Sequence, residues 1–146
     1  MDAKAPGIAQ PGGTAPRSAL LPWNIVAQCQ AVYYIVTGVW PLVHIQSFLK
    51  VTGPKTDLWL VKTVGVLVTV IGVVLGMGGA QRSARKEMAV LAVGSAAALT
   101  AIDVYYVARR RIAPIYLLDA AGEIGLIIGW LASGQTQHSA EEQTPR

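Results

Sequence analysis

The chain has 146 residues, of which 53% are hydrophobic and only 14% are charged, and its formal net charge is +4 at pH 7. A soluble domain typically carries about 25% charged residues, so this composition excludes a water-soluble two-domain enzyme and a disordered protein. The single cysteine, Cys29, excludes an internal disulfide and a multi-cysteine metal site. The basic residues lie in short clusters between apolar runs, which favours a membrane surface over nucleic acid as partner.

Four apolar stretches dominate the chain, at about residues 23–43, 58–78, 88–107 and 112–132. Each has roughly 20 residues and, at about 1.5 Å rise per residue, reaches across a hydrocarbon core about 30 Å thick. None has the polar outer face that a helix in a soluble protein needs. The sequence therefore predicts an all-α membrane protein whose one domain, residues 23–132, is a four-transmembrane-helix bundle. Pro114 is expected in the first turn of the fourth helix.

The segments outside the bundle, residues 1–22 and 133–146, are predicted to be disordered tails. The first contains four prolines and has neither helical nor alternating period, and the second is polar. Residues 1–22 also lack the apolar stretch of a secretory signal. Four spans place both tails on one side of the membrane. Because no signal directs the N-terminus outward, we expect both tails in the cytoplasm. Lysine and arginine are almost evenly divided between the two sides, so dual topology stays open.

The ionisable residues inside the spans, Lys62, Asp103, Asp119 and Glu123, are the sharpest indication of function. A charge near the centre of a membrane helix costs about 2.5–3.5 kcal/mol on insertion scales, so it is seldom accidental. All four are reached from the side of the first and third connections, and Glu123 lies nearest the midplane. The pattern predicts a polar cavity that is open on one side and contains a buried charge network.

Helical spacing indicates where these side chains point. Lys62 shares a stripe with the glycines of the second span, which predicts that it faces protein rather than lipid. Asp119 and Glu123 lie four residues apart, on one face. The predicted cavity is lined by the residues of the charge network, which are Lys62, Asp103, Asp119 and Glu123, by Tyr106 and Tyr116 as hydroxyl partners, and by a stripe of the first span with Gln30, Thr37, His44 and Tyr33 or Tyr34.

The longest connection, residues 44–57, is predicted to lie along the membrane interface and to cap the opening of this cavity. Gly53 and Pro54 mark a break in it, and Thr56 or Asp57 is a candidate cap for the second helix. The capping residues are expected to be His44, Ser47, Lys55, Thr56 and Asp57.

Structural roles stay open for several of these features. Lys62 and an aspartate can form a structural ion pair, and a protonated Glu123 can hydrogen-bond a neighbouring helix. The arginines at 109–111 are expected to anchor the protein at lipid headgroups. The tryptophans near the span ends are expected at the interfaces, and the Gly-x-x-x-Gly pairs 72/76 and 125/129 in contacts within the bundle. These tryptophans are Trp23, Trp40, Trp59 and Trp130.

No motif for catalysis or for a cofactor is present. The chain lacks the glycine-rich phosphate-binding patterns, and His44 and His138 do not have the spacing of a zinc or haem site. We therefore predict no catalytic residue, no cofactor and no metal ion. The basic residues are not interleaved with exposed aromatic residues, so nucleic acid is not an expected partner.

The second span carries a resemblance to a known family. The stretch from Thr56 to Gly65, followed by Val70, Ile71 and Gly72, resembles the second helix of small bacterial four-helix DoxX-like proteins, including uncharacterised integral membrane families. In those proteins a basic residue near the helix start precedes glycines at similar steps. The resemblance covers residues 23–132 by topology and only the second span by motif. It implies a four-helix bundle in a bacterial inner membrane and assigns no catalytic residue.

Three functions remain for such a chain. The favoured one is a non-enzymatic membrane protein, an accessory subunit or a binder of a small amphiphile, whose partners are the bilayer, the amphiphile, another membrane protein or a second copy of itself. The second is a proton-coupled exporter of small cations that uses Glu123. The third is a membrane-embedded enzyme acting on a lipid, with Glu123 or Asp119 as acid and His44 as base.

Overall fold

The structure, a computed structural model, describes residues 22–81 and 85–141 and contains five helices and no strand in these ranges. The helices are α1 (Trp23–Val43), α2 (Ile45–Thr52), α3 (Leu58–Gln81), α4 (Arg85–Ala108) and α5 (Tyr116–Glu141). All except α2 are long and apolar enough to cross a membrane. The predicted all-α fold with four spans is confirmed.

The ends of the last helix differ from the prediction. The helix α5 begins at Tyr116, so Pro114 precedes the helix and its carbonyl oxygen accepts a hydrogen bond from the Leu117 amide at 3.0 Å. The helix also runs to Glu141, beyond the predicted end at residue 132, because no proline interrupts it there. Of the predicted tails, 1–22 and 133–146, residues 133–141 belong to this helix, whereas residues 1–21 and 142–146 lie outside the described residues.

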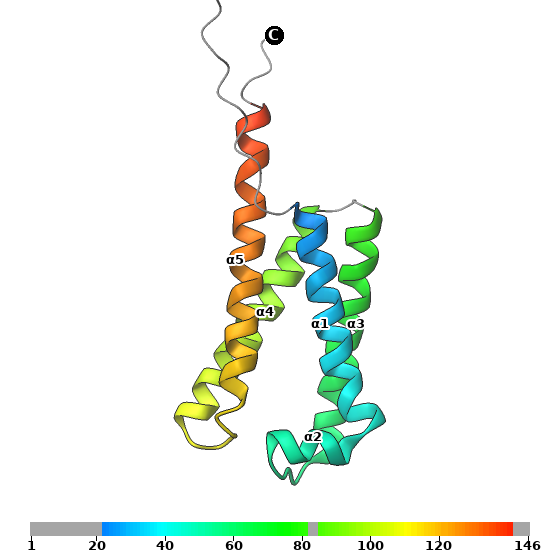
Figure 1. The fold of residues 1–146 in the computed structure, drawn as a ribbon, viewed down its shortest axis with the longest axis vertical. Helices are drawn as coiled ribbons and strands as arrows, with labels where there is room; N and C mark the ends of the chain where they lie inside the picture. The colour runs from blue at the N-terminus through cyan, green and yellow to red at the C-terminus, as the bar shows by residue number, and fades with distance from the viewer. Residues whose placement is uncertain (1–21, 82–84, 142–146) are drawn as a thin grey trace, which may run out of the picture.

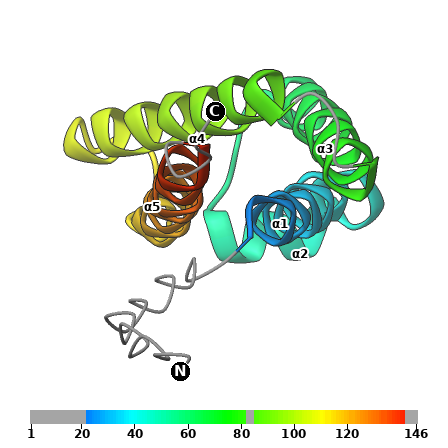
Figure 2. The ribbon, with the colours of Figure 1, turned by 90° about the horizontal axis from the view of Figure 1, so that it is seen from above.

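The four long helices form two pairs. Helix α1 packs along α3, and α4 packs along α5, whereas the interface that joins the pairs is smaller and runs mainly between α1 and α5. Figures 1 and 2 show the two pairs side by side, with α2 across the lower end of α1 and α3. The start of α1 and the end of α5 lie at the same, upper end (Figure 1).

Glycines allow α1 and α3 to approach closely. A Cβ atom at Gly65 would lie 2.6 Å from the carbonyl oxygen of Gly38, and one at Gly72 would lie 3.0 Å from the carbonyl oxygen of Ala31. Such backbone-to-backbone packing is how membrane helices associate where the hydrophobic effect contributes little between them. The pair α1–α3 is therefore closely packed along its length.

The predicted packing role of the Gly-x-x-x-Gly pairs is confirmed except at one position. Gly72 and Gly76 pack against α1, as does Gly129 of α5. Gly125 is exposed, and a Cβ atom there would have no neighbour within 4 Å. Because Gly125 faces outward, a substitution at Gly125 is a matched control for substitutions elsewhere on α5.

Candidate functional site

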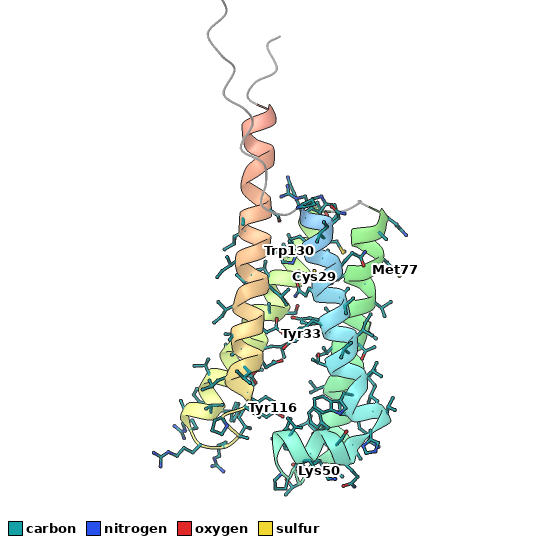
Figure 3. The ribbon with its side chains drawn as sticks, viewed as in Figure 1. Cys29, Tyr33, Lys50, Met77, Tyr116 and Trp130 are labelled. Atoms are coloured by element: carbon teal, nitrogen blue, oxygen red, sulfur yellow. The ribbon has the colours of Figure 1, made fainter. Side chains whose placement is uncertain are left out.

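Three carboxyl groups gather where the two helix pairs meet. Asp103 of α4 is 6% exposed, Glu123 of α5 is 1% exposed, and Asp119 of α5 is half-buried. We call these three residues the acidic cluster. Asp119 and Glu123 lie four residues apart and so share the face of α5 that is turned toward α1. Figure 3 shows Tyr33 of α1 and Tyr116 of α5 pointing into the same interface.

Two consecutive tyrosines of α1 bind the carboxyl groups of α5. The Tyr33 hydroxyl donates to Asp119 Oδ1, and the Tyr34 hydroxyl lies 3.0 Å from Glu123 Oε2. Tyr34 is fully buried. The first span was predicted to contribute a polar stripe with Tyr33 or Tyr34, but the charge network predicted from the sequence did not include them. The pairing of Tyr33 and Tyr34 with Asp119 and Glu123 depends on α1 being a neighbour of α5, which the spacing of residues within one helix does not show.

Around Glu123 the hydrogen bonds form a chain. The Tyr34 hydroxyl also lies 3.2 Å from Ser95 Oγ of α4, and Ser95 Oγ donates to the carbonyl oxygen of Leu91 at 2.7 Å. Each hydroxyl has one proton to give. A neutral Glu123 that donates to Tyr34 lets Tyr34 donate to Ser95 and satisfies all three contacts. An ionised Glu123 can only accept the hydrogen bond of the Tyr34 hydroxyl, so the contact between Tyr34 and Ser95 is left without a proton while Ser95 donates to Leu91.

Asp103 is the least satisfied member of the acidic cluster. In the part of the chain that the structure describes, its Oδ2 atom is buried and has no hydrogen-bond partner. Its carboxyl group interacts with that of Asp119. Two carboxylates in contact repel each other. The pair is stabilised either by a proton that the two groups share or by a hydrogen-bond donor from outside the protein. Sequence reasoning named both residues, but the unpartnered oxygen emerges only from the fold.

Toward the upper end, a buried amide closes the interface. Gln30 of α1 is fully buried, donates to the carbonyl oxygen of Ala92 at 3.0 Å and accepts a bond from Trp130 Nε1 at 2.8 Å. Trp130 is 4% exposed, so its side chain packs inside the bundle. The residue lies seven positions after Glu123 and shares its inward face. The acidic cluster is thus sealed from this side by satisfied, packed side chains.

Lys62 does not join the acidic cluster. It is exposed on α3, so its predicted protein-facing position is wrong. The face of α3 that packs against α1 is centred on Gly65 and Gly72, and Lys62 lies at the edge of that face, one turn from the helix start. A lysine at this position can extend its ammonium group toward the boundary between membrane and water.

Tyr106 also turns away from the predicted network. It is 44% exposed, and its ring packs edge-on against Tyr105 with centroids 5.2 Å apart. Both rings line a hollow of about 260 Å³ with Arg109 and Arg111 at the end of α4. Consecutive helical residues point about 100° apart. Tyr105 therefore lies away from the face of Asp103, and the contact between the two rings draws the Tyr106 ring toward Tyr105 and away from that face. The hydroxyls that bind the acids come from α1 instead.

Only part of the predicted capping loop reaches the acidic cluster. Lys55 Nζ lies over the Tyr116 ring, 4.8 Å from its centroid, and Tyr116 interacts with Asp103 and Asp119. Thr52, which was not predicted, is buried beneath the loop and interacts with Tyr116. These contacts place the end of α2 and the following loop against the start of α5.

The remaining loop residues have local roles. His44 Nδ1 accepts from the Ser47 amide at 3.1 Å, and Ser47 Oγ accepts from Trp40 Nε1 at 2.8 Å, which fixes the corner between α1 and α2. Thr56 and Asp57 are exposed at the start of α3, where the Asp57 carbonyl oxygen accepts the first helical bonds.

His44 is remote from the buried acid. It lies ten residues beyond Tyr34, which is about 15 Å along the helix axis. Because Tyr34 holds Glu123, this separation leaves His44 out of reach as a base for Glu123 in the arrangement described.

One edge of the acidic cluster lies near the surface of the bundle, where Asp119 is half-buried. Gly122 of α5 is exposed, and a Cβ atom there would lie 3.4 Å from the Tyr33 hydroxyl. No side chain of Gly122 covers the Tyr33–Asp119 hydrogen bond at this point. We call the line where Tyr33, Asp119 and Gly122 meet the seam.

No protein-family model, curated protein or solved structure shows significant similarity to the chain. Among the described residues, no three His, Cys, Asp or Glu side chains are grouped so that they could hold a metal ion. The chemistry of the acidic cluster therefore has to be inferred from its own geometry.

Proposed function

We propose that this protein is a non-enzymatic membrane protein that binds a small amphiphilic molecule at the seam. The proposal rests above all on the unpartnered buried Oδ2 atom of Asp103, next to the Asp119 carboxyl group. A polar atom buried without a partner typically costs about 1–3 kcal/mol, more if charged. A bound polar head that donates to this oxygen offsets that cost.

The surroundings of the seam suit a molecule with an apolar tail. Gly122 leaves space beside Tyr33, while Val36 and Leu118 nearby in sequence are 61% and 70% exposed. In a membrane such side chains face lipid. A ligand can place its head against Asp119 and Asp103 and leave its tail along this apolar surface without leaving the bilayer.

Blocking the seam tests the proposal. Gly122→Leu fills the space beside Tyr33, and Gly125→Leu makes the same change one turn away, where nothing lies within 4 Å. Full-length protein in a nonionic detergent is heated with n-decanol, n-decylamine or n-decanoate. At least one of them should raise the Tm of the wild type and of Gly125→Leu but not of Gly122→Leu. If none raises the wild-type Tm, or if all three proteins respond equally, the proposal is wrong.

A second candidate is a proton-coupled exporter of small cations. It is favoured by the smaller interface between the helix pairs, which is bridged by bonds from Tyr33 and Tyr34 to carboxyl groups. Changes in protonation can loosen such bonds. Cells that express the exporter should resist quaternary ammonium dyes, and Glu123→Gln should abolish that resistance. Resistance that persists in this variant would exclude the mechanism.

We also propose the membrane and its sides. The protein is placed in a bacterial inner membrane with both termini in the cytoplasm, in line with the resemblance of α3 to DoxX-like proteins. Reporter fusions before Trp23 and after residue 146 test the sides. Both fusions should be active as cytoplasmic reporters, and two opposite populations would indicate dual topology.

A further inference from the structure

We infer that the ligand of the seam is a protonated alkylamine, whose ammonium head lies between Asp103, Asp119 and the ring of Tyr116. The inference rests on the proposed amphiphile binding and adds the charge and the donor groups of the head. Three independent features of the interface lead to it: its charge, its unpartnered oxygen, and the ammonium group that already lies at its lower end.

The first feature is the sign of the charge. In the described part of the chain, the groups that interact with Asp103 and Glu123 are carboxyls and hydroxyls. Lys62, the one basic residue of α3 that was expected to neutralise them, is exposed. Asp103 and Glu123 are buried, Asp119 is half-buried, and among the described residues no basic group is found to act on the two buried acids. This arrangement favours a cationic head, because an anionic head would add a further repulsion.

The second feature is the need for a hydrogen-bond donor. Among the described residues, no group donates a hydrogen bond to Asp103 Oδ2, and Asp103 itself is only 6% exposed. A primary ammonium carries three N–H donors, enough for Asp103 and Asp119 together. A trimethylammonium group carries the same charge but no donor, so it cannot satisfy this oxygen. The geometry thus favours a primary amine over a quaternary one.

The third feature is the position that an ammonium already occupies. Lys55 Nζ lies 4.8 Å from the centroid of the Tyr116 ring, in the geometry of a cation–π contact. Partial burial lowers the pKa of the Lys55 amine, so this position takes an ammonium partly out of water. Tyr116 in turn interacts with Asp103 and Asp119. Tyr116 thus offers a ring face to an ammonium and also neighbours the two carboxyl groups, and both kinds of group attract alkylammonium ions.

Four ten-carbon probes test the inference with the full-length protein in a nonionic detergent. They are n-decylamine, n-decyltrimethylammonium, n-decanol and n-decanoate, and the dependence of Tm on their concentration gives each Kd. At pH 7 decylamine is protonated. Decylamine should bind most tightly, at least about tenfold tighter than the trimethylammonium probe, a difference of one hydrogen bond to a charged group.

Two substitutions locate the head. Asp103→Asn should weaken decylamine binding at least about 30-fold, the usual effect of removing one partner of a buried charge pair. Glu87→Gln, an exposed acid in the first turn of α4, removes the same charge from the protein and should leave the Kd unchanged. Lys55→Met removes the competing ammonium at Tyr116 and should tighten binding at least about threefold.

The outcomes separate this inference from the proposed function. If decanol or decanoate binds at the seam as tightly as decylamine, the cationic head is refuted while amphiphile binding stands. Equal binding of both cations would refute the donor role. An equal response of the Asp103→Asn and Glu87→Gln proteins to decylamine would show a general charge effect and refute the inference. If no probe raises the wild-type Tm, both ideas fall.

Discussion

Replacing Glu123 by glutamine is the substitution that the hydrogen-bond chain makes most informative. In the chain, Glu123 Oε2 lies 3.0 Å from the Tyr34 hydroxyl, which lies 3.2 Å from Ser95 Oγ, which donates to the Leu91 carbonyl oxygen at 2.7 Å. Three contacts need three protons, and the two hydroxyls supply two. A neutral carboxyl group supplies the third, and so does the amide of glutamine.

The expected change in stability is therefore small. Glutamine has nearly the same shape and keeps every contact of the chain, so Glu123→Gln should alter the free energy of unfolding by less than about 1 kcal/mol. For a chain of this size that is a change in Tm of less than about 4 °C. Glu123→Leu keeps the bulk but removes the hydrogen-bonding group, and it should cost about 1–3 kcal/mol because polar atoms are left unsatisfied.

Thermal unfolding of both variants beside the wild type, in one nonionic detergent, measures the difference. The reasoning would be refuted if Glu123→Gln lost as much stability as Glu123→Leu. That result would mean that the ionised carboxylate itself holds α1, α4 and α5 together, since a charged acceptor forms a stronger bond than an amide.

Three further predictions concern packing, the buried amide and pH. Gly65→Ala should destabilise the protein by about 1–3 kcal/mol, because the new methyl group meets the Gly38 backbone, whereas Gly125→Ala should be neutral or stabilising by up to about 1 kcal/mol in the same unfolding assay. Gln30→Leu should cost about 2 kcal/mol or more and shift the tryptophan emission, because it leaves the buried indole N–H of Trp130 without a partner and removes the bond between α1 and the Ala92 carbonyl oxygen; an unchanged Tm and spectrum would contradict the role assigned to the amide. The wild type should gain stability relative to Lys55→Met as the pH rises toward 10.5, because the lowered pKa lets the folded protein release this proton before the unfolded chain does, and parallel curves from pH 8 to 10 would refute this.

The fold was predictable from the sequence because the apolar runs show that the helices lie in lipid. Apolar runs of about 20 residues have few alternatives to spanning a membrane as helices, so the first three spans were placed near the observed bounds. The start of α5 was not, because the chain from Arg109 to Ile115 turns before the helix forms, and Arg110 adopts a positive φ of 54° there. Local turn geometry of this kind depends on contacts that periodicity does not report.

The site was predictable only in part, for a related reason. Spacing showed that Asp119 and Glu123 share a face, and the same spacing extended by seven residues would have placed Trp130 there as well. It could not show which helix that face meets. The pairing of α1 with α3 removes Lys62 from the acids, and the approach of α1 to α5 brings Tyr33 to Asp119. Which helices are neighbours is a property of the whole bundle.

We propose that Asp103 is retained for a ligand and not for the stability of the empty protein. The most direct test compares the Tm of Asp103→Asn with that of the wild type when no amphiphile is added. An asparagine lacks the charge and brings its own N–H donors, so the account predicts a Tm equal to or higher than that of the wild type. A drop of several degrees would mean that the carboxyl group stabilises the fold itself, and would contradict the account.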